Sequence, residues 1–334
     1  MSTVIKLSNY IIKKTSNAEE VFKGLNGVFC VYKPAGESRI KTKQKILRNI
    51  CRDMTELEVR PPENFVRIEG ETDSKLTVNV EQSYADHPLV VGPRYQPEDF
   101  RIKEAHDMST DMSGILLLGL NKGCGLIKKI KESKPMRFFK VHGILGQATD
   151  NYFIDGKILE KSSYQHVKRH HLDMISASMQ SSHQRKMFEV SGVHIQSQTA
   201  YELAVQGPIR PDDDRIPMVY SIKCIDFNPP EFTLEIVCIN EDDLFIKSII
   251  HALGIEARTT ATCTKLQCFQ YGVFNLNAAL IKRDWTLPYI SDCILRSRRT
   301  LARHRHIFKQ DDPILRDYFN QEPKNSNESL NNQK

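Results

Sequence analysis

The 334-residue sequence lacks most of the motifs by which enzymes and metal-binding proteins are recognised. It has no glycine-rich nucleotide-binding loop, no Gly-x-Ser-x-Gly elbow, no His-Glu-x-x-His helix and no Cys-x-x-Cys pair. These absences argue against nucleotide-dependent enzymes, α/β-hydrolases, zinc proteases and zinc ribbons. The longest apolar run, Ile115–Leu120, is far shorter than the roughly 20 residues of a membrane span. With 40% hydrophobic residues, 16 Gly and 15 Pro, the composition is that of a globular chain.

Thiols, imidazoles and net charge point to no particular ligand. The eight cysteines are dispersed and no secretory signal precedes them, so we expect an intracellular, reduced protein that uses its thiols mainly in its core. His166, His170 and His171 have helical spacing, but no thiol or carboxylate pattern completes a metal site. We therefore predict no metal site. Lys and Arg exceed Asp and Glu by 47 to 41, which permits a polyanionic partner without requiring one.

Changes in composition divide the chain into four parts. Residues 1–23 begin with lysines and hydroxyls and have no acid before Glu19. This pattern fits a weak mitochondrial transit segment or a basic flexible terminus, and both alternatives stay open. Residues 24–290 are expected to form the folded domain, followed by a basic extension at 291–319. The segment 320–334 is rich in Asn, Gln, Ser and Lys, and we predict that it is disordered.

The folded domain is predicted to be α+β. Strands and helices alternate irregularly along it and several strands are adjacent, which favours a mixed, largely antiparallel sheet with flanking helices. Within it we expect a polar connection at 60–100 with one strand at Leu76–Val80, a helix at 163–179, a strand at Lys186–Val190, and a helix at 243–253 that ends at Gly254.

Five sequence blocks follow one another in a characteristic order. They are Asn26–Gly36, His106–Leu116, Val141–Asp150 with Asp155-Gly156, Ala200–Gly207 and Ile246–Gly254. In this order they resemble the TruB family of RNA pseudouridine synthases. The contexts Asp86-His87-Pro88-Leu89 and Ser182-His183-Gln184 resemble its animal mitochondrial branch in particular. The resemblance covers about residues 24–290 and depends on the order of the blocks, because each block alone is weakly specific.

The resemblance implies a pseudouridine-synthase fold with a central RNA-binding cleft and a reaction that needs no cofactor. In this family an Asp carboxylate attacks a flipped-out uridine, the glycosidic bond opens, and the base rotates and re-attaches through carbon. Such chemistry requires a cation that orients the carboxylate and an aromatic ring that stacks on the base. By this resemblance we expect Lys33, Lys247, Arg298 and Arg299 near RNA phosphates, Phe139 as the stacking ring and His106 among the substrate-binding residues.

The expected nucleophile position holds a hydroxyl. The family pattern places the catalytic Asp five residues before the Gly that corresponds to Gly114, and this count arrives at Ser109. Asp107 and Asp111 each lie two residues away, so either one reaches that position only through a local shift of the loop. A Ser hydroxyl is a weak nucleophile at neutral pH without a base. His106 precedes Ser109 by three residues, but the sequence offers it no orienting partner.

Two further substitutions concern the same catalytic unit. The family's Tyr corresponds to Phe139, which keeps a stacking surface but lacks the hydroxyl. The family's Arg corresponds to Lys247, which keeps the charge but not the planar fork. By this count no carboxylate matches Lys247. Because the Asp, Tyr and Arg act together, their replacement favours a protein with weak or absent catalysis.

Three classes of function therefore compete. The favoured one is an RNA-binding protein with a relaxed catalytic site. Its expected partners are mitochondrial tRNA, mRNA or rRNA and other RNA-processing proteins of that compartment. The second is an active synthase that uses Asp107 or Asp111. The third is a protein–protein scaffold. The branch resemblance favours the mitochondrial matrix, and a cytoplasmic or nuclear location stays open; no membrane partner is expected.

Overall fold

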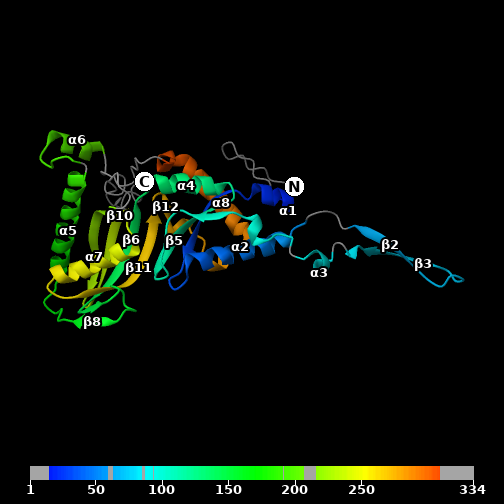
Figure 1. Ribbon diagram of the computed structural model, residues 1–334, viewed down its shortest axis with the longest axis horizontal. Coiled ribbons are helices and arrows are strands. Elements are labelled where there is room, and N and C mark those ends of the chain that lie inside the picture. The colour runs from blue at the N-terminus through cyan, green and yellow to red at the C-terminus, as the bar shows by residue number, and fades with distance from the viewer. Residues whose placement is uncertain are drawn as a thin grey trace, which may run out of the picture.

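An eight-stranded mixed sheet forms the centre of the computed structural model, which describes residues 15–58, 63–84, 87–92, 94–190, 192–206 and 216–308 (Figure 1). The strands run in the order β1-β5-β11-β6-β10-β9, with β4 beside β5 and β12 beside β11. Their bounds are β1 Gly27–Lys33, β4 Ile102–Glu104, β5 Met112–Leu120, β6 Arg137–Leu145, β9 Met218–Asn228, β10 Glu231–Ile239, β11 Ala261–Tyr271 and β12 Phe274–Asn275. β5 and β11 are parallel and the other neighbours antiparallel, so the predicted α+β class and mixed, largely antiparallel sheet are confirmed.

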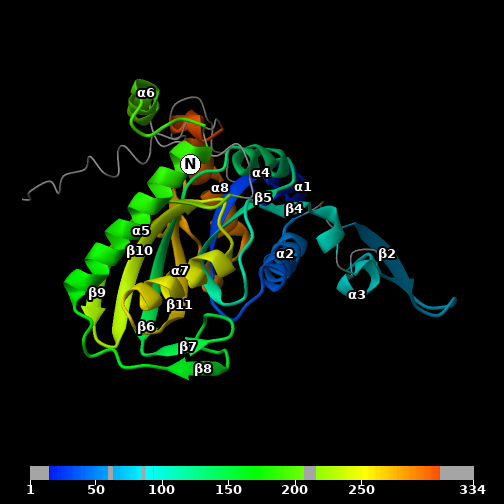
Figure 2. The ribbon, with the colours of Figure 1, turned by 60° about the vertical axis from the view of Figure 1, so that its left-hand side comes forward.

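Helices flank this sheet. Their bounds are α1 Ala18–Gly24, α2 Arg39–Thr55, α3 Pro88–Val91, α4 Gly123–Glu132, α5 Arg169–Val190, α6 Gln198–Gln206, α7 Asp243–Glu256 and α8 Leu287–Arg303. α5 packs on β9 and α7 packs on β11, and the two helices contact each other across one face (Figure 2). α4 and α8 pack against β1 at the opposite end. None of these described helices is long and apolar enough to cross a membrane.

The core follows from the burial of whole strands. The apolar run Ile115–Leu118 within β5 is completely buried, because β1 and β11 flank the strand and α4 covers it. A strand buried on both faces carries a continuous apolar sequence rather than an alternating one. This explains why the longest apolar run of the chain marks the middle of the domain.

The C-terminal ends of α5 and α7 differ from the sequence-based expectation. Residues Lys186–Val190 are the last turn and a half of α5 and not a strand, because Met187 packs into a buried cluster with Phe138. Tertiary packing here overrides the β-propensity of the segment. Helix α7 continues past Gly254 to Glu256. A Cβ at Gly254 would overlap the backbone of Ala261, so this glycine allows close helix–strand packing and does not end the helix.

The polar connection contains a hairpin where one strand was expected. Strand β2 (Asn64–Glu69) pairs with β3 (Thr77–Gln82), and the hairpin projects away from the sheet (Figure 1). The cross-strand pairs Val66–Val80 and Ile68–Val78 put four apolar side chains on one face, and each is about 60% exposed, between 59% and 67%. A second short hairpin, β7 (Gln147–Thr149) with β8 (Ile158–Lys161), lies beyond the end of β6.

Gly114 should be the glycine least tolerant of substitution. It lies in β5 with φ +123°, and a Cβ there would overlap the backbone carbonyl of Cys268 on β11. Changing Gly114→Ala should lower the free energy of unfolding by about 3 kcal/mol or more, because two strands must separate. Urea denaturation would measure this. Gly125→Ala in α4, where a Cβ meets nothing within 4 Å, is the control and should change stability by about 1 kcal/mol at most. Equal losses in the two variants would contradict this account.

Candidate active site

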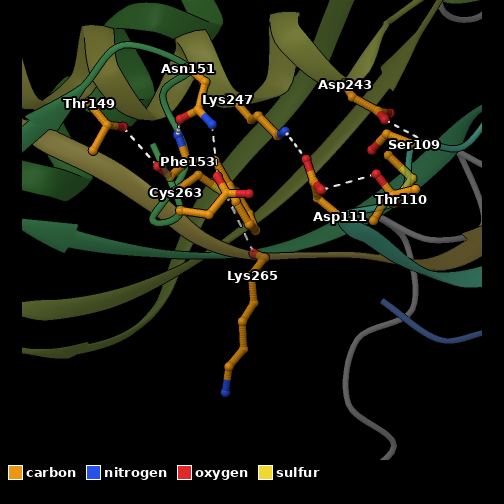
Figure 3. A network of polar contacts seen from close by, with 12 residues as sticks. Ser109, Thr110, Asp111, Thr149, Asn151, Phe153, Asp243, Lys247, Cys263 and Lys265 are labelled. Atoms are coloured by element: carbon orange, nitrogen blue, oxygen red, sulfur yellow. Dashed lines mark hydrogen bonds and ion pairs between the residues drawn. The ribbon is translucent and has the colours of Figure 1, made fainter. Parts of the chain in front are cut away.

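Three segments that are distant in sequence meet at the start of β5. In the β1–β5 ladder Lys33 is opposite Gly114, which brings the end of β1 beside the loop before β5. Helix α7 precedes β11 in the chain and packs on it, and β11 in turn pairs with Met112 at the start of β5. Lys247 precedes the end of α7 by nine residues, which span about 14 Å in a helix. The residue of β11 that pairs with Met112 follows the start of β11 by five residues, which span about 17 Å in a strand. The two lengths are similar, so Lys247 lies near the start of β5. The loop 105–111, the end of β1 and the first half of α7 therefore share one place, and Figure 3 shows the loop residues Ser109–Asp111 beside Asp243 and Lys247 of α7.

Asp111 and Lys247 form the ion pair at the centre of this place. The Lys247 ammonium donates to Oδ2 of Asp111 at 2.8 Å, and Thr110 Oγ1 donates to Oδ1 at 3.2 Å. The Lys247 side chain is 9% exposed and that of Asp111 is 28% exposed. The hydrogen bond from Lys247 is the main reason that the pKa of Asp111 lies below its ordinary value. Asp111 is therefore an ionised carboxylate with part of its surface open to solvent.

The aromatic ring beside this pair is Phe153, which the sequence analysis did not select. The Lys247 ammonium lies 4.6 Å from the centre of the Phe153 ring (Figure 3). Asn151 accepts the Phe153 N–H at 2.9 Å, and Thr149 Oγ1 donates to the Phe153 carbonyl at 2.9 Å. Phe153 lies between two parts of a matched sequence block, but no periodic pattern marked it.

Counting along the sequence placed the wrong residue opposite Lys247. Lys247 holds the carboxylate of Asp111, so the prediction that it has no matching carboxylate is wrong. The N–H of Ser109 donates to Oδ2 of Asp243 at 2.8 Å, and its buried Oγ has no hydrogen-bond partner among the described residues. The loop bends between Asp107 and Met112, so a count that assumes the family's loop length does not give the residue that faces α7.

The other two polar residues of the loop are directed elsewhere. Asp107 forms an ion pair with Arg39 of α2, and its side chain is 71% exposed. The buried ring of His106 contacts the Ile115 carbonyl through Nε2 at 3.0 Å and stacks on Tyr271 with 4.4 Å between ring centres. Burial lowers the pKa of His106 well below its ordinary value, so this ring is neutral and braces the loop against β5.

Lys33 holds the loop from the side of β1. Its fully buried ammonium donates to the carbonyls of Met112 at 2.6 Å, Pro34 at 3.2 Å and Thr110 at 3.3 Å. Burial lowers the pKa of Lys33 to about 8, although the carboxylates of Asp243 and Asp111 act in the opposite direction. The Lys33 ammonium thus donates its hydrogen bonds to backbone carbonyls. Its expected contact with an RNA phosphate remains a prediction.

Phe139 and the two arginines lie outside the ion pair's contacts. Phe139 has no exposed surface, and the guanidinium carbon of Arg137 lies 4.9 Å from its ring centre. A base could stack on Phe139 only if Arg137 moved, so that role also remains a prediction. Arg298 and Arg299 lie on α8, which packs against β1 and α2, whereas the helix of Lys247 packs against β11 and α5. Arg298 donates to the carbonyl of Asn26 at 3.2 Å.

Residues 105–109 of the loop line one side of a cavity of about 680 Å³. Its lining includes His106, Ser109, Arg137, Asp243 and Tyr271. Because Ser109 and Asp243 are joined by a hydrogen bond and both line the cavity, this bond forms part of the wall. Among the residues that the structure describes, no cluster of His, Cys, Asp or Glu side chains could hold a metal ion.

Comparison with known proteins identifies relatives over most of the chain. A family model described as TruB family pseudouridylate synthase, N-terminal domain, matches residues 106–242. A mitochondrial pseudouridylate synthase TRUB2 of Xenopus tropicalis is 34% identical over 84% of this chain and 88% of its own length. The human protein of the same name is 34% identical over 81% and 83%. A chain of the archaeal box H/ACA sRNP Nop10–Cbf5 complex has a TM-score of 0.45 and 11% identity, with 80% of this chain and 59% of that chain covered.

The burial of Lys33 should be visible in the pH dependence of stability. Because its folded pKa of about 8 lies below the ordinary lysine value of about 10.4, the unfolded chain binds more protons between these limits. The free energy of unfolding therefore includes a rise with pH from about 8 to about 10.4. Lys33→Met should lack this rise, on the order of 1–3 kcal/mol, in urea titrations across the range. Lys265→Met, at an exposed lysine of β11, should retain it; parallel wild-type and Lys33→Met curves would refute the explanation.

Proposed function

Because this chain belongs to the TruB family of pseudouridylate synthases, we propose that it isomerises uridine in RNA with Asp111 as the nucleophile. The single observation that carries this proposal is the contact of 2.8 Å between Asp111 and the buried ammonium of Lys247. Asp111 is the carboxylate of its loop that meets this cation. This function is the second of the three classes that the sequence left open, an active synthase that uses Asp107 or Asp111.

Asp111 has the properties that the chemistry requires of a nucleophile. Its lowered pKa keeps it ionised at neutral pH, so no base has to remove a proton before attack. Lys247 and Thr110 engage the two carboxylate oxygens and fix the orientation of the group. In the proposed reaction the N1–C1′ bond of uridine breaks, a C5–C1′ bond forms, and the C5 proton is lost while N1 gains one. The substrate and product are isomers, so no co-reactant is needed.

Lys247 should orient the carboxylate less strictly than the family's arginine. An ammonium is a point charge on a flexible stem, whereas a guanidinium binds both carboxylate oxygens in one plane. The Phe153 ring and the burial of Lys247 restrict that flexibility here. We therefore expect turnover that is slower than an arginine-containing site would give.

RNA binding without isomerisation is the second candidate function. Ser109 occupies the position that the family pattern assigns to the nucleophile, and its hydroxyl is buried without a hydrogen-bond partner among the described residues. A site that has lost its nucleophile and kept its fold would have this arrangement. The protein–protein scaffold has no specific observation in its favour.

The proposed partner is mitochondrial RNA. The relatives' names include the word mitochondrial, and the excess of six basic residues suits a polyanion. That this RNA is tRNA, mRNA or rRNA, and that other RNA-processing proteins accompany it, are separate proposals. Residues 1–14 of the suggested transit segment 1–23 lie outside the described residues, as does the whole tail 320–334.

Pseudouridine formation on a pool of uridine-containing transcripts tests the proposal directly. Asp111→Asn should reduce the rate by about 100-fold or more, because the amide cannot attack. Ser109→Ala should retain most of the activity, since its hydroxyl takes no part. If the wild-type chain is silent, binds RNA and gains activity with Ser109→Asp, the second candidate is correct and Asp111 is not the nucleophile.

The salt dependence of RNA affinity tests the basic surface of α8. Replacing Arg298 and Arg299 together by Gln should weaken binding and reduce the slope of log affinity against log salt by roughly 1–2, because each neutralised phosphate releases counterions. Arg283→Gln, at a side chain that is 81% exposed, is the control and should leave the slope unchanged. An unchanged slope in the double variant would place the RNA elsewhere.

A further inference from the structure

Helix α7 contacts the loop before β5 at two points. Asp243 accepts the N–H of Ser109 at 2.8 Å, and Lys247 donates to the carboxylate of Asp111 at 2.8 Å. Side chains four residues apart lie on the same face of a helix. The two contacts therefore come from one helical face and reach two positions of the loop that are themselves two residues apart (Figure 3).

Met108 is buried in the core and anchors the loop beside Ser109, but packing does not hold the loop on the side of the cavity. The cavity of about 680 Å³ borders Ser109 and Asp243, so no close-packed side chains press on the loop from that side. On the other side the Lys33 ammonium holds the carbonyls of Thr110 and Met112, and the N–H of Gly36 donates to the Thr110 carbonyl at 2.8 Å. These bonds fix the end of the loop at β5. They do not reach Ser109, which Asp243 alone holds among the hydrogen bonds of the described residues.

We propose that Asp243 is a positioning residue that fixes the bend of the loop and thereby presents Asp111, rather than Ser109, to Lys247. The proposal depends on the proposed function only for its effect on turnover. Its structural part concerns the contact between Asp111 and Lys247 and applies whether or not the protein is active.

Two substitutions separate the hydrogen bond of Asp243 from its charge. Asp243→Asn keeps an oxygen that can accept the Ser109 N–H but removes the negative charge. Asp243→Ala removes both. Glu256→Ala removes an acid from the exposed end of the same helix and serves as the control for net charge. All variants are made in the full chain.

The pKa of Asp111 can be measured by carbon NMR of labelled aspartates, with the Asp111 signal assigned through Asp111→Asn. Its change in the variants has opposite signs for a loss of charge alone and for a loss of the contact with Lys247. Deleting a neighbouring anion without moving the loop would lower the pKa of Asp111, because one repulsive charge disappears. Losing the contact with Lys247 would raise it. We expect Asp243→Ala to raise the pKa of Asp111 by about one unit and Asp243→Asn and Glu256→Ala to change it by a few tenths at most. An unchanged or lowered value in Asp243→Ala would overturn the proposal.

Single-turnover isomerisation supplies the second measurement. Asp243→Ala should reduce the rate at saturating RNA by about 10-fold or more while RNA affinity stays within about twofold, since a misplaced nucleophile costs rate and not binding. Asp243→Asn should restore the rate. If the wild-type chain isomerises uridine, an equal rate in Asp243→Ala would also overturn the proposal. If the wild-type chain does not isomerise uridine but the titration behaves as expected, the proposed function fails and the positioning role of Asp243 stands.

Discussion

The close approach of β5 and β11 at Gly114 is the constraint on which the site depends. These two strands are parallel, so the loop before β5 lies where α7, running back over β11, presents its first turns. A side chain at Gly114 would push the strands apart and separate Asp111 from Lys247. The glycine therefore links core packing to chemistry: the same backbone contact that closes the middle of the sheet also sets the distance between the two charges.

The charges around the loop balance one another in space. Two ammonium groups, of Lys33 and Lys247, alternate with the two carboxylates of Asp243 and Asp111, although the four residues come from three separate segments. A buried charge is tolerated when it is paired and hydrogen-bonded. In this cluster each cation also binds a specific part of the loop, Lys33 its carbonyls and Lys247 its carboxylate. Neutralisation and positioning are therefore achieved by the same contacts.

The sequence predicted those features that depend on local pattern and failed where three-dimensional context decides. The apolar run of β5 and the glycine blocks identified the architecture, because burial and close backbone approach restrict residue type directly. The partner of Lys247 could not be found by counting residues, since the loop is hydrogen-bonded to Lys33 and Asp243, which come from other segments of the chain. Phe153 lies beside Lys247 but carried no periodic signal in the sequence. The β-propensity of Lys186–Val190 predicted a strand, because propensity does not include the tertiary packing of this segment beside Phe138.

The hairpin β2–β3 makes the charge distribution of the molecule asymmetric. Residues 63–82 contain five acids and two bases, a net charge of −3, whereas the whole chain carries +6. The remainder is therefore at +9, and the negative part is carried on an arm that projects from the sheet (Figure 1). In the field of a polyanion such a molecule experiences a torque that turns the arm outward and the basic body inward. A polyanion would thus orient the protein before any surface contact forms, and salt would weaken this alignment over the Debye length.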